Sequence, residues 1–312
     1  MDRKQTEIVQ DTGWLYLVIL ILFFASMIFS EAASEGSIIG LIVSLVLSDG
    51  ALILPCLVFM RINHRSPVQM LRLRRIRIST MFLSALYVIC WYPMIAAMNA
   101  ITMIFTDNTA EQMMEEVSDA PFPLVWLTVA FIAPFMEEAA FRGVMLSGLK
   151  SGGRIFSAII VQGILFGFLH LNLNQMAYAS VLGIAFGILV EATGSLWTSF
   201  LGHMLVNTVG VSSMYALKDV AETLSGAAGG EDAGSPLLFL GAAGVMLVVS
   251  CITVPLAMLL LRAMSYSEGR DEKFHRIFRR REQKNTGEAV LSLPVILALV
   301  LGGVFMIIRA VA

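Results

Sequence analysis

Charged side chains are scarce in this sequence. Of its 312 residues only 14% are Asp, Glu, Lys or Arg, whereas 57% are hydrophobic, and the mean hydropathy is +0.80. Soluble domains carry roughly a quarter charged residues, so the composition excludes an ordinary soluble protein. The long apolar runs predict an all-α fold, a polytopic membrane bundle of about eight or nine transmembrane helices.

Cysteine is also rare, and neither sign of charge predominates. The three cysteines, Cys56, Cys90 and Cys251, fall inside apolar runs, with no spacing typical of a disulfide or a zinc site. We therefore expect them to be small buried hydrophobic residues. The net charge of −2 gives no indication of nucleic-acid binding. Neither an internal repeat nor a soluble domain is recognisable along the chain.

Nine apolar segments can be read as membrane spans, since a span requires about 20 apolar residues. They lie near residues 14–30, 37–60, 80–105, 122–147, 155–172, 176–193, 196–216, 236–262 and 289–311. The first follows Arg3 and Lys4, as a signal peptide would. It is long for that role, and the AAS at 32–34 is a poor cleavage site, so we expect a retained span.

The connections between these spans alternate in charge. The 61–77 segment has six arginines and no acidic residue, and the 264–287 segment has seven basic residues against four acidic ones. The 31–36, 106–120 and 217–235 segments are acidic. Because basic connections stay in the cytoplasm, the alternation predicts a cytoplasmic N-terminus and an external C-terminus. We expect a multi-pass protein of the cell membrane, in a bacterial plasma membrane.

The fourth span contains EEAAFR, residues 137–142. A charged group at mid-bilayer costs roughly 3 kcal/mol, so such groups are paired, hydrated or functional. Glu138 and Arg142 are four residues apart and share a helix face, which predicts a structural ion pair. Glu137 lies about 100° further round the helix and has no local counter-charge. It is either an interfacial glutamate or a base that activates water.

Two further polar pairs follow in the later spans. Phe166 and His170 lie at the end of the fifth span, and His203 and Asn207 lie one helical turn apart in the seventh. Two convergent donors can hold a developing oxyanion in a dry site. Alternatively, His170 is a polar residue at a helix end, and His203 and Asn207 form an interhelical hydrogen bond. The concentration of all these groups in four consecutive spans favours one shared site.

The depth of these residues in the bilayer raises a difficulty. Folding the fourth and fifth spans at 152–153 places Glu137 opposite about residue 168, close to His170, at about 20 Å from the cytoplasmic end. Turning the chain at 194–195 places His203 only about 12 Å deep. Tilt, or a span that does not fully cross, would close the gap.

Other residues in these spans suggest packing. Glycines four residues apart predict close approach of the fifth and sixth helices, namely Gly163 with Gly167 and Gly183 with Gly187. Asp49, in the second span, is expected to be a helix-end or packing carboxylate. Glu191 and Thr193 are expected to mark the cytoplasmic end of the sixth helix, and Gln162 and Asn172 are open candidates to line a cavity.

The ordered motifs EExxxR, FxxxH and HxxxN, each on its own hydrophobic span, resemble those of the CPBP family. These intramembrane glutamic proteases, also called the Abi family, include type II CAAX prenyl endopeptidases and bacteriocin-processing or immunity proteins. The resemblance covers roughly residues 121–212, including GSLW at 194–197. It divides the chain into N-terminal helices at 1–120, a CPBP-like catalytic core at 121–216 and C-terminal helices at 217–312.

The resemblance also implies roles for individual residues. Within a helical core whose cavity opens to the cytoplasm, Glu137 would be the general base and His170 would orient the water. The pair His203 and Asn207 would stabilise the oxyanion. Supporting roles would fall to Glu138, Arg142 and Phe166. The reaction would be attack of water on a peptide carbonyl, without an acyl-enzyme and without a cofactor.

The substrate implied is a membrane-associated peptide or protein, of CAAX type or a peptide precursor, reached within the lipid bilayer. Zinc held by two carboxylates and two histidines is an alternative chemistry, although HExxH is absent and a paired Glu138 is a poor free ligand. A non-catalytic, immunity-like membrane protein is an alternative function, against which the complete set of motif residues argues. A transporter is disfavoured because neither broken helices nor paired repeats are evident.

Overall fold

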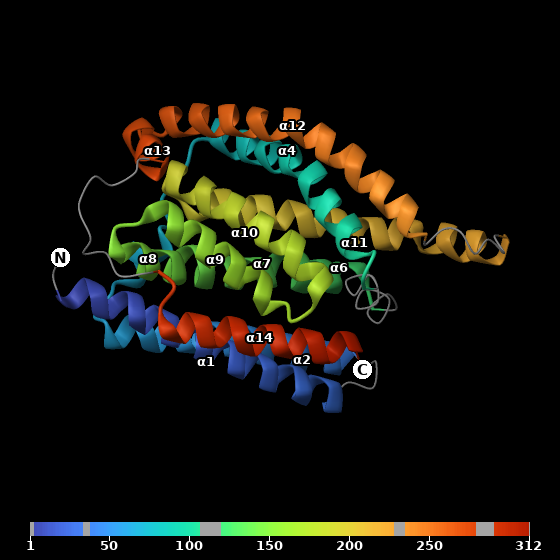
Figure 1. Ribbon diagram of the computed structural model, residues 1–312, viewed down its shortest axis with the longest axis horizontal. Helices are drawn as coiled ribbons and strands as arrows, with labels where there is room; N and C mark the ends of the chain where they lie inside the picture. The colour runs from blue at the N-terminus through green and yellow to red at the C-terminus, as the bar shows by residue number, and fades with distance from the viewer. Residues whose placement is uncertain (1–2, 34–37, 107–119, 228–234, 279–289, 312) are drawn as a thin grey trace.

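The computed structural model describes residues 3–33, 38–106, 120–227, 235–278 and 290–311 (Figure 1). Within these ranges the chain is helical and contains no strand, which confirms the all-α bundle. The principal helices are α1 (Arg3–Ala33), α2 (Ile38–Ile62), α4 (Ile78–Thr102), α9 (Ile155–Leu169), α10 (Leu173–Thr193), α11 (Leu196–Ala227), α12 (Pro236–Ser267) and α14 (Leu293–Val311). The short helices α3 (Pro67–Leu71) and α13 (Asp271–Phe278) lie in the basic connections.

The fourth predicted span is a single helical path with changes of pitch. It runs through α6 (Phe122–Val125), η1 (Trp126–Ile132), α7 (Ala133–Glu138), η2 (Ala139–Met145), α8 (Leu146–Leu149) and η3 (Lys150–Gly152). The segments η1 and η2 are π-helical, and they flank the short α7 that carries both glutamates. π-Helical turns are rare and occur often at functional sites, because they rotate the residues that follow them.

Each of the nine predicted spans coincides with a helical segment, but the segments differ in length and polarity. Among the described residues, six helical stretches are long and apolar enough to cross a membrane: 7–29, 42–62, 78–102, 122–152, 173–193 and 236–267. The helices α9 and α14 are apolar but shorter. α11 falls outside both groups, since its first half carries the polar residues Ser199, His203, Asn207 and Thr208.

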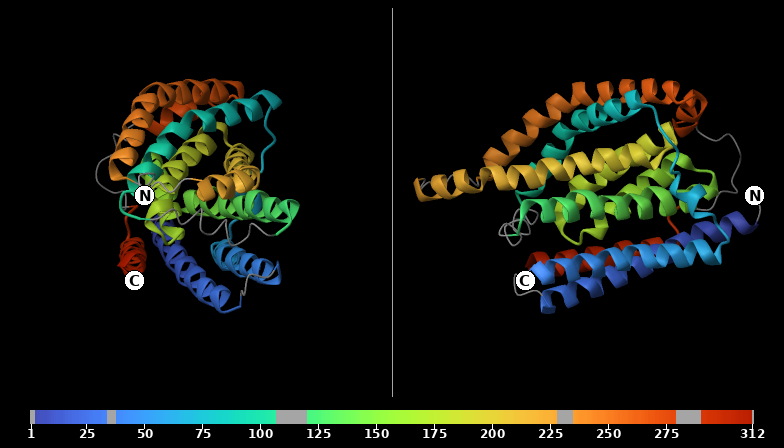
Figure 2. Two further views of the ribbon diagram at one scale, coloured as in Figure 1. Left: turned by 90° about the vertical axis from the view of Figure 1, so that its right-hand side faces the viewer. Right: turned by 180° about the vertical axis from the view of Figure 1, so that it is seen from behind.

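The helices form three layers (Figures 1 and 2). α1, α2 and α14 lie on one side, α4 and α12 lie on the other, and α7, α9, α10 and the first part of α11 lie between them. α4 packs along α12, and α1 packs against both α2 and α14. Helices from the two ends of the chain therefore cover the middle segment jointly. The division at residues 120 and 216 stays a prediction.

The outer faces are apolar, as a lipid-facing surface requires. Large hydrophobic side chains are exposed along α4 and α12, including Phe82 at 70%, Leu237 at 80% and Ile252 at 73%. Cys56 and Cys90 are buried as predicted, but the prediction for Cys251 is wrong: its side chain is exposed on α12. Many side chains of α12 face away from the other helices. An apolar residue in this helix can therefore face lipid and need not be buried within the protein.

The glycines of α9 and α10 let the two backbones touch. A Cβ on Gly183 would lie 2.8 Å from Cα of Gly163, and a Cβ on Gly167 would lie 2.4 Å from the carbonyl oxygen of Met176. The side-chain amide of Gln162 donates to the carbonyl of Gly183 at 2.8 Å. This confirms the predicted close approach, and it makes Gln162 a helix-to-helix tie that is fully buried.

The turn between α10 and α11 is covered by the basic connections. Glu191 is 6% exposed and forms ion pairs with Arg72 and with Lys150. Nζ of Lys150 lies 2.8 Å from Oε1 of Glu191. The guanidinium of Arg270 donates to the carbonyls of Glu191 and Ala192 at 3.1 and 3.2 Å. Gly194 has φ 76°, and a Cβ there would lie 2.5 Å from Arg270. The turn therefore lies inside the protein, beneath three segments distant in sequence.

The predicted charge alternation is only partly described. The acidic connection at 106–120 lies largely outside the described residues, and those at 31–36 and 217–235 lie partly outside them, as does 264–287. The arginine-rich residues 61–77 and α13, which lies in the 264–287 connection, are at the end of the bundle where the N-terminus lies (Figure 1). Which end faces the cytoplasm stays a prediction.

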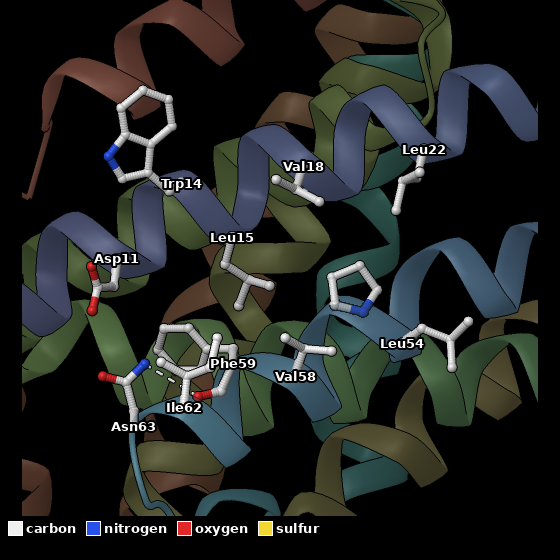
Figure 3. A pocket seen from close by; sticks show the side chains of 11 residues that line it. Asp11, Trp14, Leu15, Val18, Leu22, Leu54, Val58, Phe59, Ile62 and Asn63 are labelled. Carbon is white, nitrogen blue, oxygen red and sulfur yellow. Dashed lines mark hydrogen bonds between the residues drawn. The ribbon is translucent and has the colours of Figure 1, made fainter.

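A groove of ≈ 490 Å³ runs between α1 and α2 (Figure 3). Its walls are apolar and include Val18, Leu54 and Val58, while Asp11 and Asn63 lie together at one end. None of the residues of the EExxxR, FxxxH and HxxxN motifs lines it. The groove is therefore separate from the polar cluster described next.

Candidate active site

A buried ion pair forms the base of the polar cluster. Nη1 of Arg142 lies 2.8 Å from Oε1 of Glu138, and both residues have an exposed fraction of 0%. The guanidinium lies over the ring of Phe166, with Cζ 4.2 Å from the ring centroid, and 5.3 Å from that of Phe186. The predicted pairing is confirmed. Aromatic faces complement a guanidinium where water is excluded, so Phe166 and Phe186 compensate part of its desolvation.

His203 lies between the two glutamates. Its Nδ1 is 3.1 Å from Oε1 of Glu138, and its Nε2 is 3.6 Å from Oε2 of Glu137. The imidazole is 4% exposed and contacts the rings of Phe166 and Phe186, with centroids 5.8 and 5.5 Å away. An ionised Glu138 can only accept a hydrogen bond, so Nδ1 of His203 carries the proton and donates, which assigns the tautomer that the sequence left open.

The two adjacent glutamates differ in accessibility. The side chain of Glu137 is 22% exposed, whereas that of Glu138 is 0% exposed and already neutralised by Arg142. Glu137 is therefore partly accessible from outside the protein, and Glu138 is not. This separation follows from their positions about 100° apart on the helix.

His170 occupies the end of α9, beside Phe166. Its Nδ1 lies 3.1 Å from the carbonyl oxygen of Phe166, and the two rings contact edge to face at 5.2 Å between centroids. The same Phe166 ring contacts His203, so both imidazoles pack against one phenylalanine. The three-residue turn after α9 holds it there: Leu171 is in the left-handed region at φ 54°, and the amide of Asn172 donates to the carbonyl of His170 at 3.2 Å.

Asn207 is one helical turn beyond His203 and contacts the backbone of η1. Its Nδ2 donates to the carbonyl oxygen of Val129 at 2.9 Å. The π register explains this contact, since the N–H of Ala133 bonds to the carbonyl of Thr128, five residues earlier. The next bond in that register would join Pro134 to Val129, but proline has no N–H. Asn207 supplies the missing donor and retains one amide hydrogen for another partner.

Aromatic packing holds α7 and η1 against α11. Phe200 meets Phe131 and Phe135 edge to face, with centroids 5.4 and 5.5 Å apart, and Trp197 lies 6.2 Å from Phe135. The indole N–H of Trp126 donates to the hydroxyl of Thr208 at 3.0 Å. These contacts set the rotation and height of α11, so that His203 meets Glu137 and Glu138.

The discrepancy in depth is resolved by two features. α9 has 15 residues, about 22 Å at the α-helical rise, so it ends within the bundle at His170 rather than crossing it. The α10–α11 turn is not at the surface: Ser195 is 0% exposed, and the N–H of Leu196 donates to the carbonyl of Arg72 at 3.2 Å. The sequence-based depth of His203 was measured from the turn at 194–195 as if that turn lay at the surface. Because the turn is buried, this measurement underestimated the depth of His203.

The structure thus brings together six of the predicted site residues: Glu137, Glu138, Arg142, Phe166, His170 and His203. The seventh, Asn207, lies one helical turn from His203 and contacts the backbone of η1. Sequence reasoning missed Phe186, whose apolar type and place in α10 give no signal of a contact with Arg142. Within the described ranges, no three His, Cys, Asp or Glu side chains are arranged to hold a metal ion.

The fold and this cluster define a class: an all-α multi-pass membrane protein with a carboxylate, two imidazoles and an amide gathered among its central helices. Residues 119–209 match the family model described as Type II CAAX prenyl endopeptidase Rce1-like. The matched range contains all seven motif residues, and it confirms the resemblance to CAAX or CPBP-type proteins in that segment.

A curated relative is similar over a segment of comparable length. The protein named "Putative membrane peptidase YdiL", from Bacillus subtilis (strain 168), is 26% identical over 86 residues, which is 28% of this chain and 35% of that protein. The aligned segment thus spans about a third of the relative's length. No solved structure matches the chain significantly. At the level of class, these findings support a membrane protease.

Proposed function

We propose that the protein is an intramembrane endopeptidase in which Glu137 activates water to hydrolyse a peptide bond. The observation that carries the proposal is the pairing of an accessible glutamate with a buried one. Glu137 is 22% exposed and lies 3.6 Å from His203, while the adjacent Glu138 is held by Arg142. Among the described residues no Arg or Lys neutralises Glu137, and a partly buried carboxylate beside imidazole and amide donors has the properties of a general base.

Each neighbour then has a role. Glu138 accepts a hydrogen bond from Nδ1 of His203 and orients the imidazole, leaving Nε2 directed at Glu137. With Nδ1 already protonated, Nε2 donates only in the imidazolium form, so His203 stabilises the oxyanion as a cation. Asn207 contributes its second amide hydrogen, and His170 orients the attacking water from the other side of Phe166.

The reaction proceeds in two steps with no covalent enzyme intermediate. Glu137 takes one proton from water as the oxygen attacks the carbonyl carbon, and the negative charge moves to the carbonyl oxygen beside His203 and Asn207. Glu137 then gives its proton to the peptide nitrogen, the C–N bond breaks, and the charge returns to form a carboxyl group. The products are a new C-terminus and a new amine, and Glu137 is a carboxylate again.

The substrate class follows from the location. A site among the central helices of a bundle is reached by a peptide that is itself membrane-associated, such as a lipid-modified C-terminus or a peptide precursor. We propose that the end of the bundle bearing residues 61–77 and α13 faces the cytoplasm of a bacterial cell. Substrate approach would then be from the cytoplasmic side.

Cleavage of a fluorogenic peptide by the purified protein in nanodiscs tests the proposal. Glu137→Ala and Glu137→Gln should each lower kcat by about a hundredfold or more, because general-base catalysis contributes at least that much. Glu272→Gln, in exposed α13, is the matched control and should retain activity. Full cleavage by Glu137→Gln would overturn the assignment of the base. Peptide binding without cleavage by the wild type would favour a non-catalytic, immunity-like protein.

A further inference from the structure

Two tyrosines outside the segment matched by the family model reach the central layer from the two outer layers. Tyr16 lies on α1 and Tyr87 on α4, and both have an exposed fraction of 0% (Figure 1). The hydroxyl of Tyr16 donates to the carbonyl oxygen of Leu165 on α9 at 2.7 Å. The hydroxyl of Tyr87 donates to the carbonyl oxygen of Ala185 on α10 at 2.9 Å. Each outer layer thus contributes a buried tyrosine that is hydrogen-bonded to a central helix.

Each acceptor carbonyl belongs to the residue directly before a phenylalanine of the site, namely Phe166 on α9 and Phe186 on α10. The guanidinium of Arg142 contacts both rings, with Cζ 4.2 and 5.3 Å from their centroids. The imidazole of His203 packs against the same two rings, with centroids 5.8 and 5.5 Å away. The two tyrosines therefore bind the backbone at the points from which these rings extend.

The ring of Tyr16 reaches Phe166 by a second route. It meets Phe141 edge to face, with centroids 6.3 Å apart, and Phe141 meets Phe166 edge to face at 5.1 Å. Edge-to-face pairs favour one relative orientation of neighbouring rings. Tyr16 therefore constrains Phe166 both through the α9 backbone and through a row of packed rings.

The turn of α4 that carries Tyr87 also contacts α11 beside His203. A Cβ on Gly202 would lie 2.6 Å from Cγ2 of Val88 and 3.1 Å from Cε1 of Phe186. Val88 directly follows Tyr87 on α4, and Gly202 directly precedes His203 on α11. The turn bearing Tyr87, the ring of Phe186 and the α11 backbone therefore meet next to the imidazole of the site.

A buried tyrosine hydroxyl needs a hydrogen-bond partner, but this need alone does not select which carbonyl it binds. Both acceptors lie inside helices, where the N–H four residues further on uses one lone pair of the carbonyl, so the tyrosine bond is an additional one. Such a bond fixes where the central helix lies relative to the outer layer. The place of both acceptors, one residue before each ring of the pair, connects the tyrosines to the site.

We propose that Tyr16 and Tyr87 are positioning residues that hold the two phenylalanine rings against His203. Held in this way, the rings keep the imidazole from turning away from Glu137, and they cover the guanidinium of Arg142. This inference rests on the proposed function, because the reaction at Glu137 is what requires a fixed imidazole. It assigns to α1 and α4, two helices outside the matched segment, a part in shaping the site.

Peptide cleavage by phenylalanine variants tests the inference, since they keep the ring and remove only the hydroxyl. Tyr16→Phe and Tyr87→Phe should each lower kcat about tenfold and leave KM unchanged, because they misplace groups that act in the reaction rather than groups that bind the peptide. Tyr215→Phe is the matched control, because it removes a hydroxyl-to-carbonyl bond of the same kind, to Ala120. It should keep kcat. An unchanged kcat in either folded test variant, or an equal loss in the control, would overturn the inference while leaving the protease intact.

The imidazole NMR signals of the four histidines give a second readout that needs no activity. The ring next to the Tyr16 bond contacts both His170 and His203, whereas the ring next to the Tyr87 bond contacts His203. Tyr16→Phe should therefore shift the signals of both imidazoles, and Tyr87→Phe should shift mainly those of His203. Tyr215→Phe should shift neither.

The outcomes separate the inference from the proposed function. Unchanged His203 signals in both test variants would overturn the inference, whether or not the protein cleaves a peptide. The expected shifts in a protein that cleaves no peptide would refute the proposed function and keep the tyrosines as positioning residues of the rings. 4-Aminophenylalanine in place of either tyrosine keeps the ring and a donor, so it should preserve kcat. A tenfold loss with that replacement would overturn the inference even where a phenylalanine variant does not fold.

Discussion

The side-chain amide of Asn207 donates a hydrogen bond to the carbonyl oxygen of Val129, 2.9 Å away. The bond replaces the one that Pro134 cannot make in the π register of η1. Asn207 thus connects α11 to the helical path carrying Glu137 and Glu138. Of the two roles expected for Asn207, oxyanion stabilisation and an interhelical hydrogen bond, the structure shows the second, and this bond supports the helix that carries the proposed base.

These two duties of Asn207 can be separated by a double substitution. Asn207→Ala leaves the partly buried carbonyl of Val129 without a donor, and we expect a loss of about 1–3 kcal/mol in unfolding free energy. Adding Pro134→Ala restores a backbone N–H and should recover the stability. If Asn207 also stabilises the oxyanion, the double variant stays impaired in kcat. Thermal denaturation and peptide cleavage on the same samples measure the two effects, and recovery of full activity would remove Asn207 from the chemistry.

The ion cluster at Glu191 should be a major source of stability. Glu191→Gln removes the partner of two cations, Arg72 and Lys150, at a site with little solvent. Breaking a buried pair from one side costs about 3 kcal/mol, so the melting temperature should fall by several degrees. Glu272→Gln, on exposed α13, serves as the control and should change it little. An unchanged melting temperature in Glu191→Gln would mean that these ion pairs contribute little to stability.

The α9–α10 contact should not tolerate a methyl group. Gly183→Ala would place Cβ 2.8 Å from Cα of Gly163, so the helices would have to separate. We expect a loss of about 1–3 kcal/mol and lower activity, because His170 ends one of these helices. Gly241→Ala, in α12, meets nothing within 4 Å and is the matched control. Equal melting temperatures for the two variants would contradict the backbone contact.

Metal removal distinguishes the two chemistries considered for the site. Glu138 is paired with Arg142, so a metal would have to displace that ion pair to use the carboxylate. We expect peptide cleavage to be unchanged after dialysis against a chelator and after addition of zinc. Loss of activity on chelation, restored by zinc in wild type and not in His203→Ala, would favour a zinc-dependent protease instead.

Several features of the fold and site could be predicted because they depend on short spacings within one helix. Each of the nine apolar runs coincides with a helical segment in the described part of the chain, and the spacing of four residues identified the Glu138–Arg142 pair. The glycine spacings predicted the contact of α9 with α10 for the same reason. The exposure of Cys251 could not be predicted, because hydropathy is the same for a residue facing lipid and a residue facing another helix.

The sequence by itself determined the membrane class, the helices and the residues that share each helical face, because these depend on composition and on the helical period alone. Only the tertiary structure decided that His203 lies between Glu137 and Glu138 and that Asn207 completes a π-helical turn. These relationships depend on the height and rotation of one helix against another. Buried turns, aromatic contacts and a proline without an N–H set that height and rotation, and none of them has a fixed spacing along the chain.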